Sequence, residues 1–221
     1  MKTLLSLFDY TGNWAYPFQE AGWNIILWDI KHTQDMYSYF KDVNEACTDF
    51  FYEHIFDNYG TVDGILAALP CTDFAGSGAR WWKGKDNDGR TRASLELLDQ
   101  TMRIIDLCEP DFWVIENPVG RINRLVPEMA KYGPRYFQPY QYGDPYTKKT
   151  GLWGEFNFPE PTKIVEPVMY EGKNGKRGSY MWAKLGGNSE RTKELRSITP
   201  EGFAYAFCEA NLNYSRLGET G

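Results

Sequence analysis

A cysteine at the start of a loop is the first residue whose type and position suggest chemistry. Cys71 follows Pro70 directly after an apolar run at residues 62–69, and a glycine-rich stretch begins at Gly76. Most cysteines are buried and inert. A thiol that opens a loop at a strand end is instead placed to act as a nucleophile, provided that it ionises to the thiolate.

A carboxyl group and an amide end another apolar run. Glu116 and Asn117 close the segment at residues 112–117. Burial at a strand end would raise the pKa of such a carboxyl group and suit it to general acid–base catalysis. The simpler alternative is a solvated strand terminus.

Two features suit a nucleotide-type cofactor. Gly12 closes a turn after the apolar run at residues 4–8, and its backbone could approach a ligand closely. Asp29 ends the next apolar run, where an acidic side chain binds ribose hydroxyls in Rossmann-like folds. A tight turn and a strand terminus would leave the same pattern, so both interpretations remain open.

The elements that must position these residues alternate between strand-like and helical patterns. Strands are expected at residues 4–8, 24–30, 62–69 and 112–117, and helices at residues 14–22, 44–58, 91–108 and 199–214. This alternation predicts an α/β fold with a mostly parallel sheet and helices on both faces. Ligands bind beyond the carboxyl ends of the strands in such sheets, where the residues above fall.

Composition and charge exclude several classes of protein. The 4 cysteines are far apart and the chain has only 2 histidines, which argues against a disulfide framework or a metal site and favours the cytoplasm. No stretch is long enough to span a membrane. The net charge of −6 argues against a generic nucleic-acid binder, although residues 141–200 carry ten Lys and Arg against seven Asp and Glu.

Taken together, these motifs resemble the cytosine C5-methyltransferase family, with short phage-type members the most similar. The matching residues follow the family's order along the chain. They are Ser6-Leu7-Phe8 through Gly12 for the cofactor loop, Asp29 for the ribose, Asp42 for the adenine amino group, Pro70-Cys71-Thr72-Asp73-Phe74-Ala75 for the catalytic motif, Glu116-Asn117-Pro118 for the Glu-Asn-Val motif, Tyr142-Gly143-Asp144-Pro145 through Lys148, and Arg196 through Pro200.

The resemblance implies a Rossmann-like class I S-adenosylmethionine-dependent methyltransferase fold and methyl transfer to carbon 5 of cytosine in DNA. Cys71 would add to carbon 6 as the nucleophile, while Glu116 would act at N3. The cytosine must be flipped out of a duplex or lie in single-stranded DNA. Where the family has an arginine against the cytosine O2, this chain has Lys148, and Lys149 is the alternative residue for the same role.

The resemblance also assigns binding residues. The cofactor contacts would be Phe8, Tyr10, Gly12, Asp29, Asp42 and Pro70, with Tyr10 replacing the first glycine of the family's cofactor loop. The substrate contacts would be Pro70, Arg80, Trp81, Asn117, Lys149 and Arg196. Trp81 and Trp82 either close over the substrate or pack against the core, and the sequence does not decide between these.

Three parts of the chain are expected. Residues 1–150 would form the cofactor-binding and catalytic core, residues 151–195 a small recognition-type insert, and residues 196–221 a segment with a helix that packs back on the core. So small an insert leaves few side chains to read base edges. It predicts a short or loose sequence preference, or a protein partner that supplies recognition.

Two alternatives stay open. In the first, the same chemistry acts on RNA or a free cytosine nucleotide, which the acidic charge and the small insert motivate. In the second, the chain is a non-catalytic protein of the same fold that binds DNA or a partner. The presence of both Cys71 and Glu116 speaks against the second, because a binding module needs neither. Whether the transferred group is an unmodified methyl group is not specified by the sequence.

Overall fold

A central sheet positions the candidate residues. The computed structural model describes residues 1–29, 31, 53, 55–171, 175–183, 185 and 189–215. Within these residues, six strands pair in the order β2-β1-β3-β4-β6-β5. They are β1 (Thr3–Leu7), β2 (Asn24–Trp28), β3 (Gly64–Ala67), β4 (Phe112–Pro118), β5 (Arg135–Phe137) and β6 (Thr150–Glu155).

The first four strands run parallel. β1 lies between β2 and β3, so that Leu5 is paired with both Ile26 and Ile65, and β3 pairs with β4. β1 and β3 are buried along their whole length, as expected for strands covered on both faces. β6 runs antiparallel between β4 and β5. The predicted mostly parallel sheet is confirmed.

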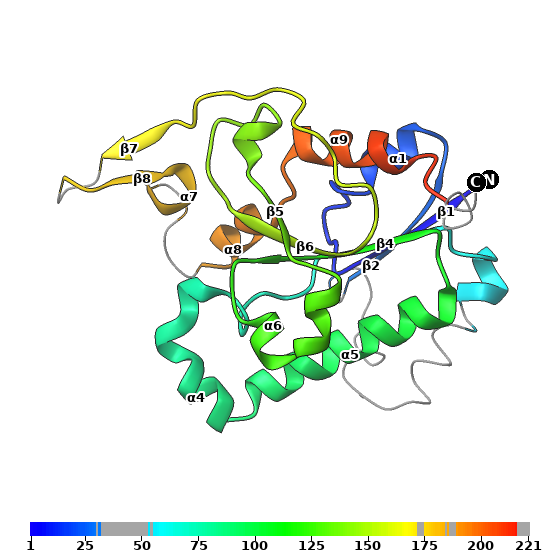
Figure 1. Cartoon of the computed structure of the whole chain (residues 1–221), viewed down its shortest axis with the longest axis horizontal. Coiled ribbons are helices and arrows are strands. Elements are labelled where there is room, and N and C mark those ends of the chain that lie inside the picture. The colour runs from blue at the N-terminus through cyan, green and yellow to red at the C-terminus, as the bar shows by residue number, and fades with distance from the viewer. Residues whose placement is uncertain are drawn as a thin grey trace.

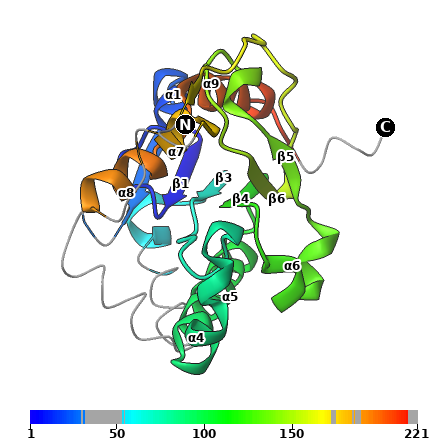
Figure 2. The ribbon, with the colours of Figure 1, turned by 90° about the vertical axis from the view of Figure 1, so that its left-hand side faces the viewer.

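Helices cover both faces of this sheet (Figures 1 and 2). One face carries α1 (Tyr16–Glu20) and α9 (Glu201–Asn211), and the other carries α5 (Arg90–Cys108) and α6 (Ile122–Leu125), with α4 (Trp82–Asn87) beside α5. Leu98 of α5 belongs to one apolar core, and Phe207 of α9 belongs to another. The α/β architecture predicted from the sequence is therefore confirmed. The helix expected at residues 44–58 lies mostly outside the described residues.

Stacked rings and a glycine hold the last helix against the sheet. Phe203 of α9 stacks on Phe137 of β5, with ring centres 3.6 Å apart and planes within 5° of parallel. Gly202 approaches the Tyr142 carbonyl so closely that a Cβ atom would lie 1.8 Å from that oxygen. The closing helix expected at residues 199–214 is confirmed.

The first residues of the insert expected at residues 151–195 contribute to the main sheet. Residues 150–155 form β6, so the chain leaves that sheet only after Glu155. Two glycines, Gly151 and Gly154, weaken the strand pattern there, which is why the sequence did not predict this strand. The division into core, insert and C-terminal segment stays a prediction.

Beyond β6 the chain forms small elements and then returns to the sheet. β7 (Met169–Glu171) and β8 (Arg177–Ser179) make a hairpin that projects from the body of the molecule (Figure 1). α7 (Tyr180–Ala183) and α8 (Glu190–Ser197) follow it. Three short 3-10 helices fill other connections: η1 (Gly76–Trp81), η2 (Pro127–Lys131) and η3 (Pro139–Gln141). Of the helices in the described residues, none is long and apolar enough to cross a bilayer.

Candidate active site

The end of the sheet where the parallel strands finish is hollowed into a cavity of about 520 Å³. Ligands of parallel sheets bind at this edge. Four of the residues assigned to the cofactor line the cavity: Phe8, Tyr10, Asp29 and Pro70. Pro70 was also assigned to the substrate, and four more residues assigned to catalysis or substrate line the cavity: Cys71, Glu116, Lys148 and Arg196.

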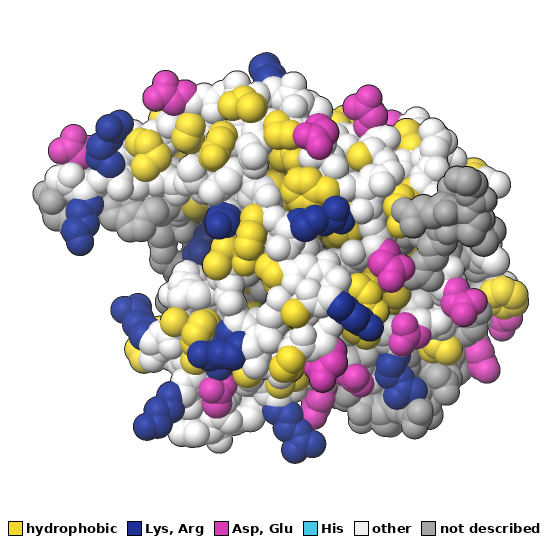
Figure 3. Space-filling model, viewed as in Figure 1, with side chains coloured by type: hydrophobic (Ala, Val, Ile, Leu, Met, Phe, Trp, Pro, Cys, Tyr) yellow, Lys and Arg dark blue, Asp and Glu magenta, His cyan; other side chains and the backbone are white. Residues whose placement is uncertain are grey.

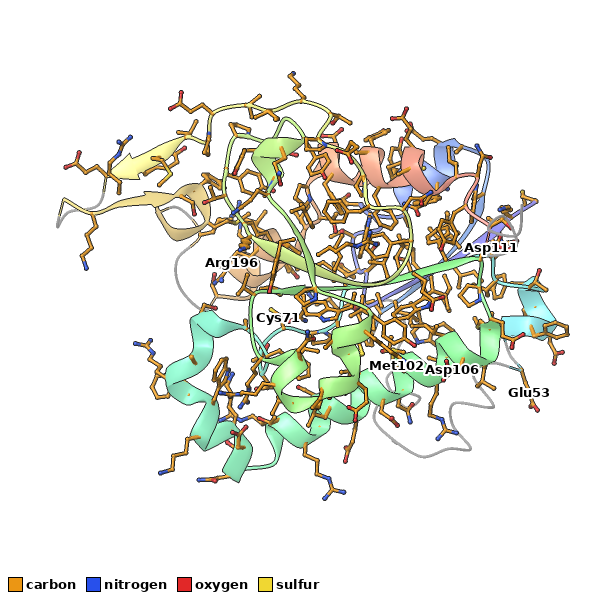
Figure 4. The ribbon with its side chains drawn as sticks, in the orientation of Figure 1. Glu53, Cys71, Met102, Asp106, Asp111 and Arg196 are labelled. Atoms are coloured by element: carbon orange, nitrogen blue, oxygen red, sulfur yellow. The ribbon has the colours of Figure 1, made fainter. Side chains whose placement is uncertain are left out.

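The surface of the molecule is hollowed on the side where these residues lie. The space-filling view is hollowed between the β7–β8 hairpin and the region of α4 (Figure 3). Figure 4 shows Cys71, on the loop after β3, and Arg196, on α8, facing this space. Segments far apart in the sequence therefore meet at one site.

The loop after β1 reaches the cavity through an uncommon backbone conformation. Phe8 has a φ of 59°, and its N–H donates to the Trp28 carbonyl at 2.7 Å. Such strain in a non-glycine residue persists only where the surroundings impose it, and it is frequent at ligand sites. The buried Asp9 carboxylate organises the turn by accepting from Ser6 Oγ at 2.9 Å and from the Gly12 N–H at 2.9 Å. Burial raises the pKa of Asp9.

Gly12 influences the cavity only through the turn that it shapes. It is buried at a φ of 70°, and a Cβ atom there would lie 3.0 Å from Leu27 Cδ1. It does not line the cavity, in contrast to the close approach expected from the sequence. Gly12 shapes the turn that presents Phe8 and Tyr10 instead.

Asp29 stands at the end of β2, where the sequence placed the ribose-binding carboxylate. Its Oδ1 accepts from the Lys31 N–H at 2.9 Å, and the residue lines the cavity. Asp42, assigned to the adenine amino group, lies outside the described residues.

Cys71 is accessible from the cavity, although protein atoms crowd its sulfur. Burial, followed by the negative charge of Glu116, raises the pKa of the Cys71 thiol. The positive charges of Lys148 and Arg196 act in the opposite direction. These two cations therefore favour the thiolate that a nucleophile requires.

Glu116 and Asn117 are adjacent on β4 but occupy different environments. Glu116 lines the cavity, where burial raises its pKa and the charge of Lys148 lowers it. Asn117 is fully buried, and its Nδ2 donates to the Leu69 carbonyl at 2.8 Å. Asn117 does not line the cavity, and its amide ties β4 to the segment before Cys71.

The structure also separates the two adjacent lysines. Lys148 lines the cavity, with its Nζ 3.4 Å from the Ile198 carbonyl. Lys149 is exposed, does not line the cavity, and its Nζ lies 4.4 Å from the centre of the Tyr136 ring. Of these two lysines, Lys148 is therefore the one that reaches the cavity.

We expect Lys148→Met to slow alkylation of Cys71 by iodoacetamide and to shift its pH dependence upward. Loss of the positive charge raises the pKa of both Cys71 and Glu116, since Lys148 lowers both. Peptide mapping after alkylation across a pH series measures both the rate and its pH dependence. Lys149→Met is the matched control, and an equal shift in that variant would contradict the assignment.

Arg80 and Trp81 lie outside the cavity lining. They belong to η1, which replaces the open loop expected from the sequence, and Trp81 is 59% exposed. The Arg80 guanidinium lies 5.0 Å from the centre of the Trp81 ring. Trp81 therefore does not pack in the core, whereas Trp82 is partly buried beneath the guanidinium of Arg121 at 4.7 Å.

The charged residues of the cavity that sequence reasoning missed include Lys31 and Glu194. Lys31 Nζ lies 2.7 Å from Glu194 Oε1 and 4.8 Å from the centre of the Tyr10 ring. Lys31 follows Asp29 by two residues, so its place could have been inferred from that of Asp29. Glu194 lies 163 residues further along the chain, and no local pattern predicts that α8 returns to this edge.

Comparisons with known proteins agree with this geometry. A family model described as C-5 cytosine-specific DNA methylase matches residues 2–124. No curated protein sequence matches the chain. Among the described residues, no group of three or more His, Cys, Asp and Glu side chains is arranged to hold a metal ion.

Among the solved structures similar to the chain are one protein encoded by a prophage and one from an insect. The first is described as a DNA modification methyltransferase encoded within a prophage of E. coli, with 18% identity, a TM-score of 0.47, and coverage of 76% of this chain and 53% of that one. The second is a mutant of DNMT2 from Spodoptera frugiperda, with 21% identity, a TM-score of 0.44, and coverage of 77% and 59%. The matched part of the chain thus spans little more than half the length of these structures.

Proposed function

The chain belongs to the C-5 cytosine-specific DNA methylase family, and from that premise we propose that it transfers a methyl group to carbon 5 of cytosine in DNA. The observation that carries the proposal is the convergence of Cys71, Glu116 and Lys148 on one cavity that Asp29 also lines. A nucleophile, a carboxyl group with a raised pKa and a cation are the groups that this reaction needs.

The cavity fits S-adenosylmethionine, the donor that this family generally uses. Its volume of about 520 Å³ lies within the range of small-molecule sites. Asp29 offers carboxylate acceptors for ribose hydroxyls, while Phe8 and Pro70 offer apolar surface for the adenine. When bound, the cofactor would supply a methyl group on a positively charged sulfur, which makes that methyl group electrophilic.

Cys71 takes part in the first step of the proposed reaction. Its Sγ adds to carbon 6 of cytosine as the thiolate, and the displaced electron pair of the ring activates carbon 5 for methylation. After the methyl transfer, a base, either water or a side chain, removes the proton from carbon 5. The electron pair of that C–H bond restores the ring double bond and expels Cys71 as the thiolate.

Glu116 and Lys148 would hold the charge of the ring. Because burial raises the pKa of Glu116, its carboxyl group keeps a proton to donate to N3 at higher pH than an exposed glutamate would. Lys148 would face the cytosine O2 with its ammonium group. An ammonium lacks the planar fork of a guanidinium, so it would act mainly as a point charge.

The proposed substrate is duplex DNA with a flipped cytosine, or single-stranded DNA, because carbon 6 is inaccessible in a stacked base pair. Arg196 at the cavity and the exposed Arg80, Trp81 and Lys149 would contact the nucleic acid. The small insert suggests loose sequence recognition, or a protein partner that supplies it. We place the activity in the cytoplasm, bacterial or phage-infected, where the Cys71 thiol stays reduced.

The net charge of −6 disfavours a polyanion and thus favours a free cytosine nucleotide as a second candidate substrate, with RNA as a further alternative for the same chemistry. The experiment that tests the proposal is incubation of the protein with labelled S-adenosylmethionine and, in parallel, duplex DNA, single-stranded DNA, RNA or dCMP. Nucleoside mass analysis identifies both the base and the transferred group. Label in 5-methyldeoxycytidine of DNA supports the proposal. Label confined to RNA or dCMP, or no label in any substrate, contradicts it.

We expect Asp29→Ala to weaken cofactor binding by about 10- to 100-fold, the cost of losing hydrogen bonds to a charged group. The cause is direct, because the Asp29 carboxylate would no longer accept from the ribose hydroxyls. Isothermal calorimetry measures the affinity. Asp99→Ala, at an exposed site on α5 outside the cavity, is the control and should leave the affinity unchanged. Equal affinity of Asp29→Ala and the unaltered protein would remove Asp29 from the site.

A further inference from the structure

A buried group of charged side chains lies beside the loop that carries Cys71. Lys85 is 6% exposed, Asp73 7% and Arg121 2%. Charged side chains are almost never buried so completely unless they are paired, because removing their hydration costs several kcal/mol. The proposed reaction assigns no role to any of these three residues, so their burial calls for another physical reason.

Lys85 connects α4 to the backbone next to the nucleophile. Its Nζ donates to the carbonyl of Thr72, the residue that follows Cys71. The same ammonium lies 3.2 Å from Asp73 Oδ1. One buried cation therefore contacts both of the residues after the nucleophile.

Two other elements hold Asp73. Ser94 of α5 donates from Oγ to Asp73 Oδ2 at 2.7 Å. Arg121, which precedes α6, donates from Nε to the Asp73 carbonyl at 3.0 Å and from a terminal nitrogen to Thr91 Oγ1 at 2.8 Å. Asp73 is thus fixed through both its side chain and its backbone.

The backbone that follows completes a rigid turn. The N–H groups of Phe74 and Ala75 both donate to the Cys71 carbonyl, at 3.1 and 2.9 Å. The Gly76 N–H donates to the Val119 carbonyl at 2.8 Å. The Cys71 sulfur faces the cavity while the chain behind it is bound at successive residues, so the position of that backbone sets where the sulfur points.

We propose that Lys85 is a positioning residue, which fixes the Thr72 carbonyl and thereby holds Cys71 in line with the substrate. The inference rests on the proposed methyl transfer, and it adds a residue that touches neither cofactor nor base. A displacement of about 1 Å in a reacting group can cost about 100-fold in rate. Lys85 suits the task because an ammonium is a compact donor that can meet two acceptors at once.

The charge pair and the carbonyl contact can be separated by mutation. Lys85→Met alone leaves the Asp73 carboxylate buried without its cation, which destabilises the fold. Adding Asp73→Asn removes that unpaired charge, and neutral replacements of a buried pair are often well tolerated. The double variant should therefore recover stability, while the Thr72 carbonyl still lacks its donor.

The experiment compares the unaltered protein, Lys85→Met, the double variant, and Lys83→Met as a matched control on the exposed face of α4. Thermal melting reports stability, and kcat and KM report methyl transfer to DNA. Amide hydrogen exchange at Phe74 and Ala75 reports order in the turn. For the double variant we expect near-normal melting, KM values within about threefold, kcat lower by about 100-fold, and exchange at least about tenfold faster in the turn but not in α5.

Recovery of kcat together with stability in the double variant would overturn the proposal, because it would give Lys85 a structural role alone. Unchanged exchange at Phe74 and Ala75 would overturn it as well. The exchange measurement does not depend on methyl transfer. If the unaltered protein methylates no DNA, the proposed function fails, while the exchange data still decide whether Lys85 orders the turn.

Discussion

Cys71→Ser should abolish methyl transfer, with a loss on the order of 10⁵-fold or more, the scale found when an enzyme loses its nucleophile. The serine hydroxyl has nearly the same size and stays protonated at neutral pH, so the cavity keeps its shape but loses the thiolate. Binding of the cofactor should change little, because Asp29 and Phe8 remain in place. Single-turnover assays with labelled cofactor measure the rate.

Cys108→Ser is the control for this prediction. Cys108 ends α5 outside the cavity, and burial raises its pKa to about 12, so its thiol stays protonated. Its replacement should leave the rate within about threefold, as for a substitution away from the reacting groups. Measurable turnover by the Cys71→Ser protein would show that another residue is the nucleophile.

Glu116→Gln should lower kcat by about 1,000-fold, within the range for loss of a general acid. Glutamine keeps the shape and can still form a hydrogen bond, but it carries no proton to transfer to N3. Glu155→Gln, on the neighbouring strand β6 and outside the cavity, is the matched control. A Glu116→Gln protein with unaltered kcat would show that N3 receives no proton from this residue.

The pH dependence provides a second test of Glu116. Its contribution requires the protonated carboxyl group, so it is present below its folded pKa, which burial raises, and is lost as pH increases through that value. Cys71 requires the opposite state, because the thiolate gains population as pH rises toward its own raised pKa. We expect kcat/KM of the unaltered protein to rise and then fall with pH, whereas in Glu116→Gln it should rise and level off. A fall at high pH in that variant would contradict the assignment.

The strands that carry the site were predictable because their buried residues are mostly apolar. β1 and β3 are buried throughout, and β4 is buried over its first four residues; Phe8 and Cys71 come after β1 and β3, whereas Glu116 lies within β4. β5 and β6 were missed for physical reasons: β5 has three residues, two of them exposed, and β6 contains two glycines. Neither gives the apolar pattern of a buried strand.

The sequence predicted which residues end a strand more readily than it predicted the face of the sheet to which each side chain points. Glu116 and Asn117 occupy the same strand end, yet successive side chains point to opposite faces. Glu116 therefore lines the cavity, and Asn117 turns into the core. The sequence does not show which of the two side chains faces the cavity.

Contacts between distant segments lay beyond sequence reasoning. Lys85 reads as one more charged residue in a polar stretch, and its burial depends on the tertiary packing of α4 beside the Cys71 loop. The pairing of Lys31 with Glu194 likewise depends on the return of α8 to the cofactor edge. Periodicity and motif spacing carry no information about such pairs.

The central claim is a covalent bond between Cys71 and cytosine, and one measurement tests it most directly. The protein is incubated with S-adenosylmethionine and duplex DNA containing 5-fluorocytosine, and the intact mass and the modified peptide are determined. Fluorine cannot leave carbon 5 as a proton does, so the adduct should persist with the methyl group attached. We expect a complex that maps to Cys71 and is absent in Cys71→Ser. An adduct that forms equally in Cys71→Ser, or maps to another residue, would contradict the account.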